Sequence, residues 1–239
     1  MFSPAVEKQR RQLYAQTHEG VARRLPDEAT PSPDAVFAAL RWGMEKLETA
    51  YADTPAKIRS AVACRSGCGH CCNVSIDVQA HEVLFAADHI QTHFPPDALA
   101  RVIAHTAARR ARLATLAPGT RDRFMSPCAL LYEGACTIYA GRPEACRVHH
   151  ASDASVCAAH IDDPSTDLDA VFIPPLRARM FAVMLGMDAA LEEAGFDDRA
   201  YDFGAALHEA LTNSLSLALW LRRKPAFPDS CLAEPDAGA

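Results

Sequence analysis

Apolar residues recur at steps of three and four along most of the chain, a period that predicts amphipathic helices. Residues 36–51 and 83–94 each carry one apolar stripe, and a further helix is expected from about residue 97 to residue 116. Two more stripes run through residues 176–191 and 203–219, the second with apolar side chains at strict four-residue spacing. The fold class that these stripes predict is mainly α.

The other segments lack a helical period, and each predicts a different structure. Residues 6–24 are charged and weakly patterned, so we expect a helical arm that is loosely attached. Residues 129–139 read as a short β-hairpin, and residues 142–143 as the start of a helix of one or two turns. Residues 152–175 are rich in Asp, Ser and Pro and predict a surface loop, while the tail beyond Pro225 is expected to be frayed.

These patterns divide the chain into three regions of one compact domain. N-terminal helices fill residues 1–60, and a loop-rich region that holds most of the cysteines fills residues 61–160. C-terminal helices and the tail fill residues 161–239. The expected architecture is a helical scaffold around a cysteine cluster, with a small β-hairpin.

Composition and charge narrow the class of protein. The 239 residues are 49% hydrophobic but only 7% aromatic, which favours helices over a β-sandwich. The formal net charge of -6 argues against a nucleic-acid partner, and the arginines of residues 97–116 are expected on a solvated helix face. No segment has the ~20 uninterrupted apolar residues of a membrane span, and the charged start does not resemble a secretory signal. We therefore expect a cytoplasmic protein with reduced thiols.

The cysteines carry the candidate chemistry, since eight of the nine lie between residues 64 and 157. The first group lies within nine residues and comprises Cys64, Cys68, Cys71 and Cys72. Thiolates two or three residues apart on a tight turn can converge on one metal, and Gly67 and Gly69 would let the backbone turn closely around it. Adjacent side chains of an extended backbone point in opposite directions, so Cys71 and Cys72 are expected to serve different metals or a polynuclear centre.

A second group of cysteines is spread more widely along the chain and comprises Cys128, Cys136, Cys146 and Cys157. With the first group it provides eight thiols, enough for two four-cysteine sites or for one cluster with spare ligands. His149 and His150 follow Cys146 and are further candidates to bind the metal or to support a ligand, whereas His70 is expected to point to water. Cys231 lies in the tail and is expected to bind no metal.

Three runs of residues resemble a known family. They are Cys64-x₃-Cys68-Gly-His-Cys71-Cys72, Cys128-x₇-Cys136-Thr-Ile-Tyr139 and Arg142-Pro-Glu-Ala-Cys146-Arg147. Over about residues 60–160 the chain resembles the YkgJ-type family, which is named for a CxxCxxCC motif and described as zinc- or iron-chelating; the first spacing here is three residues instead of two. The resemblance implies that the same eight cysteines bind metal.

The leading interpretation is a metal-binding protein whose thiolates hold an iron–sulfur cluster, iron or, alternatively, zinc. A zinc-stapled interaction module and a metal-cluster enzyme remain alternatives, the second by analogy with related domains in a flagellin lysine methylase. The sequence shows no P-loop, dinucleotide fingerprint, G-x-S-x-G or HExxH motif, so no catalytic residue is predicted. Eight thiolates favour closed coordination over a metal hydrolase. The expected partner is the metal itself, with no membrane, and a protein partner is not indicated.

Overall fold

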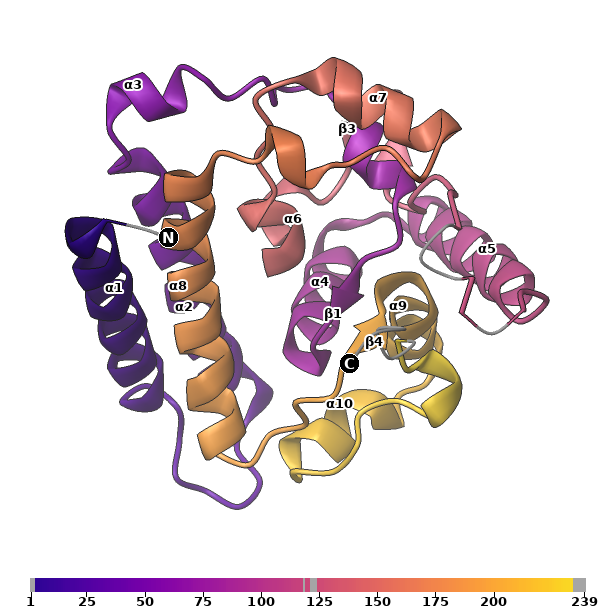
Figure 1. Ribbon diagram of the computed structural model, residues 1–239. Helices are drawn as coiled ribbons and strands as arrows, with labels where there is room; N and C mark the ends of the chain where they lie inside the picture. The colour runs from indigo at the N-terminus through magenta and orange to yellow at the C-terminus, as the bar shows by residue number, and fades with distance from the viewer. Residues whose placement is uncertain (1–2, 118, 121–123, 234–239) are drawn as a thin grey trace.

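The computed structural model describes residues 3–117, 119–120 and 124–233, and it is mainly α, as the apolar periods predicted. Its helices are α1 (Pro4–Ala22), α2 (Pro33–Ala52), α3 (Ala56–Arg59), α4 (Ala80–His93), α5 (Pro96–Leu113), α6 (Glu144–Val148), α7 (Ala154–Asp162), α8 (Pro174–Glu193), α9 (Phe203–Thr212) and α10 (Leu215–Leu221). Figure 1 shows α4 and α6 near the centre of the molecule, with the other helices arranged around them. Within the described ranges, no helix is long and apolar enough to cross a membrane.

The core forms where the predicted stripes of α2, α4, α8 and α9 meet. Its fully buried side chains include Leu40, Leu47, Ile90, Met187 and Leu207, one or two from each of these helices. Burying each such side chain contributes about 1.5–3 kcal/mol, so the four stripes supply much of the stability of the fold. Pro118, expected to close the helix before it, lies outside the described residues.

The expectation of a loosely attached N-terminal arm is wrong. Helix α1 runs along α8 (Figure 1), and the two backbones approach closely because a glycine of α8 lies at the contact. A Cβ added to Gly186 would lie 2.6 Å from the carbonyl oxygen of Tyr14 and 3.1 Å from the Cβ of Thr17. The weak pattern misled the sequence analysis because small residues, rather than large apolar ones, make this contact.

The β-hairpin is confirmed, and it is shorter than expected. Strands β2 (Leu131–Tyr132) and β3 (Ala135–Cys136) pair antiparallel across a two-residue turn. Both turn residues, Glu133 and Gly134, have positive φ, the geometry that matches the twist of a tight hairpin. A second small sheet, β1 (Asp77–Val78) with β4 (Tyr201–Asp202), was not predicted, because two residues are too few to show an alternating pattern.

Three further expectations need correction. The segment expected to be a loop contains α7 and a short 3-10 helix, and Asp153 caps α7 by accepting a hydrogen bond from the backbone N–H of Ser155 at 2.8 Å. The last stripe is two helices instead of one, since the chain breaks between α9 and α10, and Leu215 is 62% exposed. The tail is packed as far as it is described, with Phe227 and Cys231 buried.

Candidate metal centre

All eight cysteines of the two sequence groups line one cavity of about 540 Å³. They reach it from five different pieces of chain: the loop before α4, the segment after α5, the hairpin, α6 and α7. Cys231 does not line this cavity and lies buried in a 3-10 helix near the C-terminus. The two groups of thiols, which are distant in sequence, are therefore neighbours in space.

Backbone hydrogen bonds hold these pieces of chain together. The N–H of Ala63 donates to the carbonyl of Ala151 at 2.8 Å, and the N–H of Ala151 in turn reaches the Sγ of Cys64 at 3.4 Å. On the other side, the N–H of Cys128 donates to the carbonyl of Cys72 at 2.7 Å. Each of these hydrogen bonds joins the chain at or next to the first cysteine group to a segment that carries the second group. The cavity is thus built into the backbone arrangement.

Cys71 and Cys72 do not lie on an extended backbone, so the expectation that they point in opposite directions is wrong. They belong to a 3-10 helix, His70–Asn73, in which adjacent side chains are about 120° apart. The two side chains are hydrogen-bonded to each other, which is the main cause that lowers the pKa of Cys71 to about 7. Neighbouring thiols are therefore in contact, with the thiolate favoured on Cys71.

The electrostatic neighbours of each thiol indicate two groups of four. The pKa of Cys157 is raised by burial and then by Cys64, Cys71 and Cys68. The pKa of Cys146 is raised well above its ordinary value by burial and then by Cys128, Cys71 and Cys136. The neighbours of Cys72 are Cys71, Cys128 and Cys146. One set of neighbours is therefore Cys64, Cys68 and Cys157, and the other is Cys72, Cys128, Cys136 and Cys146. Cys71 adjoins both sets, and counting it with the first gives four thiols on each side.

The thiols surround a space and do not meet at a point. Among the described residues, no three of their sulfurs lie within 4.8 Å of one another. The side chain of Cys146 is accessible, although burial is the main cause of its raised pKa. These two properties fit a thiol on the wall of a cavity that lies well inside the protein.

Two arginines bring positive charge to the same cavity. Arg142 and Arg147 line it, and their side chains are 12% and 4% exposed. Arg147 donates to the carboxylate of Glu48 at 2.5 Å and to the carbonyl of Ala140, which fixes the guanidinium in place. Arg142 lies over the ring of Tyr139. Fixed cations beside a set of thiols favour the thiolate form, which is the form that binds metal.

Histidines also line the cavity. His149 and His150, candidates from the sequence, do so together with His160, which the sequence analysis overlooked. Burial lowers the pKa of His149 to about 4, so its imidazole is neutral at pH 7 and could bind a metal. His150 stacks on Tyr51, and its Nδ1 is buried without a hydrogen-bond partner. His70 is not among the lining residues.

Arg109 departs from the expected solvated helix face. It is buried, donates to Asp202 at 3.1 Å and to the hydroxyl of Ser75 at 2.8 Å, and lines the same cavity. The pair joins α5 to the residue that caps α9, so Arg109 fixes one wall of the cavity. Arg110 also pairs with a carboxylate, that of Glu209 on α9.

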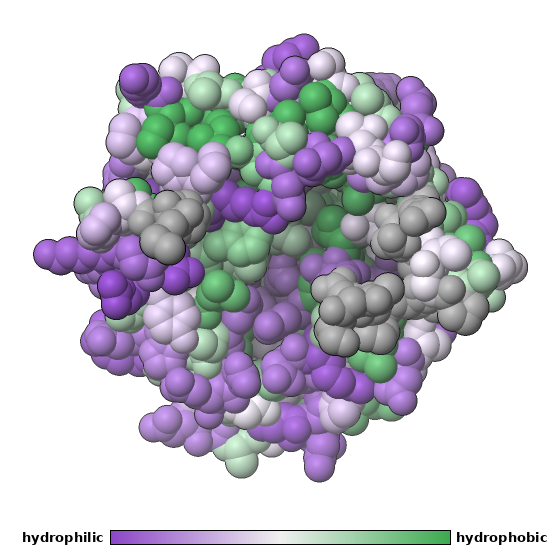
Figure 2. Space-filling model, viewed as in Figure 1, coloured by the Kyte–Doolittle hydropathy of each residue, from purple (hydrophilic) through white to green (hydrophobic). Residues whose placement is uncertain are grey.

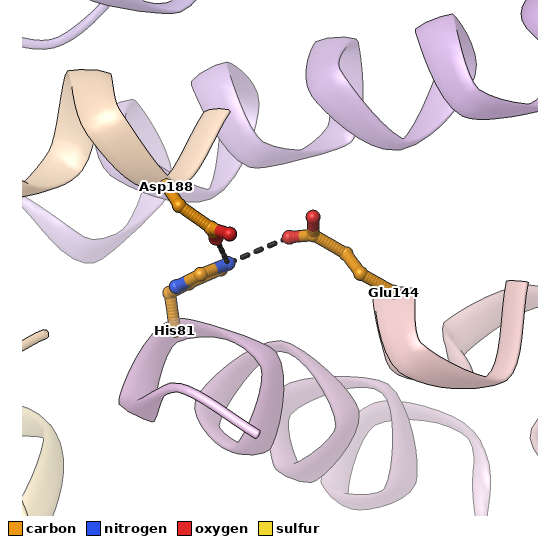
Figure 3. Close-up of side chains that lie close together, drawn as sticks. All are labelled: His81, Glu144 and Asp188. Atoms are coloured by element: carbon orange, nitrogen blue, oxygen red, sulfur yellow. Dashed lines mark hydrogen bonds and ion pairs between the residues drawn. The ribbon is translucent and has the colours of Figure 1, made fainter. Parts of the chain in front are cut away.

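A second cluster of polar side chains, absent from the sequence analysis, lies on the other side of α6. His81 on α4, Glu144 on α6 and Asp188 on α8 point toward one another (Figure 3). The Nε2 of His81 is 2.6 Å from Oε1 of Glu144 and 3.7 Å from Oδ1 of Asp188. No local spacing could reveal this cluster, because its members come from three helices that are distant in sequence.

This second cluster is buried, and its electrostatics follow from that burial. The side chains of His81, Glu144 and Asp188 are 1%, 0% and 16% exposed. Burial, followed by the charge of Glu144, raises the pKa of Asp188 to about 8. Glu82 also lies nearby, but its oxygens accept hydrogen bonds from the backbone N–H groups of Gln79 and Ala145. The burial of Glu82 is therefore explained by hydrogen bonds to backbone N–H groups at the starts of α4 and α6.

Asp188 also lines a smaller cavity of about 300 Å³ between α8, α6 and β1. Apolar side chains such as Phe172 and Phe181 form much of its wall, and Arg177 lies at it. Figure 2 shows the face viewed in Figure 1 as hollowed near its centre, with apolar surface in the hollow and polar surface around it. His149 and Ala145 line both cavities, so α6 and the residue after it separate them.

A helical scaffold around a cavity lined with eight thiols defines a class of cysteine-rich metal-chelating proteins. Residues 63–163 match the family model CxxCxxCC, which carries the description "Putative zinc- or iron-chelating domain". This part of the chain is similar to that domain, and the resemblance seen in the sequence is confirmed. No curated protein and no solved structure matches the chain.

Proposed function

We propose that this protein holds an iron–sulfur centre on the eight cysteines, and that this is its function. The observation that carries the proposal is the convergence of all eight thiols on one cavity of about 540 Å³. Family membership supports the coarser statement, chelation of zinc or iron. The geometry is the reason to extend it to a ligand set: Cys64, Cys68, Cys71 and Cys157 on one side, and Cys72, Cys128, Cys136 and Cys146 on the other.

The choice of iron–sulfur over zinc rests on the size of the space and the number of thiols. A structural zinc ion draws four sulfurs to about 2.3 Å from one point. Here eight sulfurs surround a larger volume, which inorganic sulfide and iron together could fill. The fixed charges of Arg142 and Arg147 would offset the negative charge of thiolates around such a centre. When bound, the centre would supply one-electron chemistry.

The test is metal analysis of the full chain purified without air. An iron–sulfur protein should be brown, absorb broadly at roughly 400 nm, and contain iron and acid-labile sulfide in similar amounts. Aerobic purification serves as the comparison, because oxygen can destroy an iron cluster and let zinc take the thiols. A colourless anaerobic protein with stoichiometric zinc would reject the iron–sulfur centre and support a zinc staple. Absence of any bound metal would reject both.

A further inference from the structure

We propose that His81, Glu144 and Asp188 form a separate binding site for a divalent first-row metal ion such as Mn²⁺ or Fe²⁺. The site lies on the far side of α6 from the cysteine cavity and contains no sulfur. One imidazole nitrogen and oxygens of two carboxylates lie within 4.8 Å of one another. They project from α4, α6 and α8, so the packing of three helices fixes their arrangement (Figure 3).

The carboxylates of Glu144 and Asp188 both approach one nitrogen, Nε2 of His81. Nε2 of His81 can share at most one proton in a hydrogen bond, and its contact with Oε1 of Glu144 at 2.6 Å uses that position. Asp188 approaches the same nitrogen at 3.7 Å, and Oε2 of Glu144 is buried with no hydrogen-bond partner. A proton can therefore satisfy only part of this cluster. A divalent cation in place of that proton would be bound by the nitrogen and by both carboxylates at once.

Other charges in the protein provide only part of this compensation. Within the described part of the chain, the only ion pairs of Glu144 and Asp188 are those with His81. Arg147 lies one turn along α6 from Glu144 and its charge acts on that carboxyl, but its guanidinium is hydrogen-bonded to Glu48 and to Ala140 instead of to Glu144. Leaving buried carboxylates without a matching positive charge costs several kcal/mol. Glu82, by contrast, is satisfied by backbone N–H groups, so burial of a carboxylate here does not by itself imply a metal.

The smaller cavity gives the site an entrance and an open side. Asp188 lines that cavity, whereas His81 and Glu144 lie behind it and are fully buried. A mixed nitrogen and carboxylate ligand set suits Mn²⁺, Fe²⁺ or Zn²⁺, and three protein ligands leave positions free for water or a small anionic ligand. Arg177 at the cavity wall, which also pairs with Asp169 at 2.7 Å, would add positive charge beside such an anion. The cysteine cavity would prefer softer or sulfide-bridged metals.

Mn²⁺ tests the proposal, because thiolates compete poorly for it and its electron paramagnetic resonance signal separates free from bound ion. The full chain, with its cysteine site loaded as purified, is titrated with Mn²⁺ alone. We expect one bound Mn²⁺, with a nitrogen coupling in the electron spin echo from His81. Asp188→Asn and Glu144→Gln keep the side-chain shape and should each weaken Mn²⁺ binding by about tenfold or more. Glu193→Gln is the matched control, an exposed carboxylate on the same helix whose partner is His18 on α1, and it should bind as the wild type.

Thermal unfolding keeps the proposal falsifiable if a variant folds poorly. Mn²⁺ should raise the melting temperature of the wild type and of Glu193→Gln, but not that of Asp188→Asn. Because Asp188→Asn removes one of two opposed carboxylates, its metal-free form should melt no lower than the metal-free wild type. Wild-type protein that binds no Mn²⁺, or binding that is unchanged in both Asp188→Asn and Glu144→Gln, would overturn the proposal. The cysteine-bound metal of each variant is measured in parallel, so a change at that site is distinguished from a change at this one.

Discussion

Glu144 and Cys146 lie two residues apart on α6 and belong to different sites. Residues at this separation on a helix point about 200° apart. The carboxylate of Glu144 contacts His81 at 2.6 Å, while the thiol of Cys146 lines the cysteine cavity. A helix of five residues thus separates the two sites, and the backbone N–H of Ala145 donates to Glu82 at 3.1 Å to fix its start.

The two groups of four thiols lead to a prediction about metal content. Cys146→Ser and Cys157→Ser each remove a ligand from a different group, so each should lower the iron content of anaerobically purified protein by about half. Cys231→Ala is the matched control, since Cys231 is buried away from the cavity, and its iron content should equal that of the wild type. Iron content that is unchanged in both serine variants would show that these cysteines are not ligands.

Removal of the metal should loosen the cysteine region before the helical scaffold. The pieces of chain around the cavity are joined by few backbone hydrogen bonds, whereas α2, α4, α8 and α9 share a continuous core. Hydrogen exchange after chelation should therefore rise first in residues 64–75 and 124–157, with α2 and α8 still protected. Exchange that rises equally throughout the chain would contradict this order.

Close packing of α1 on α8 predicts a cost for a single added methyl group. In Gly186→Ala the new Cβ would lie 2.6 Å from a backbone oxygen of α1, which cannot move aside as a flexible side chain could. Overpacking should lower the free energy of unfolding by about 1–3 kcal/mol, more than alanine's helix preference returns. Leu185→Ala, at an exposed neighbouring position, should have a smaller effect in the same thermal melts. An unchanged or raised melting temperature for Gly186→Ala would refute this contact.

The sequence predicted those features that repeat along the chain. Apolar stripes showed α2, α4, α5 and α8, and the cysteine spacing marked the eight thiols that line one cavity, because both signals are local. The way these thiols divide within the cavity differs from their order along the chain. Features made by contact between distant segments stayed hidden. The buried role of Arg109 depends on Asp202, and the cluster around His81 depends on two other helices. Short elements such as α7 were not predicted, because the polar residues that cap a helix are also the residues that are common in loops.

The acid sensitivity of the C-terminal segment should depend on Asp197. Burial acts to raise the pKa of this carboxyl, but hydrogen bonds from Arg199, from Tyr201 at 2.6 Å and from the N–H of Ala226 at 2.7 Å lower it overall. Because the pKa of Asp197 is lower in the folded state than in the unfolded chain, this carboxylate stabilises the fold at pH values above its pKa in the unfolded chain. That contribution to stability is lost as the pH falls through the pKa of Asp197 in the folded protein.

Asp197→Asn should therefore lower the free energy of unfolding by about 2–3 kcal/mol near pH 7, since three donors lose a charged acceptor. The melting temperature should fall by about 4–10 °C, and the difference from wild type should shrink as the pH falls below about 4, the ordinary pKa of an aspartate. Asp198→Asn, an exposed neighbour, controls for the loss of one negative charge. A difference between Asp197→Asn and wild type that grows on acidification would show that the pKa of Asp197 is raised instead of lowered.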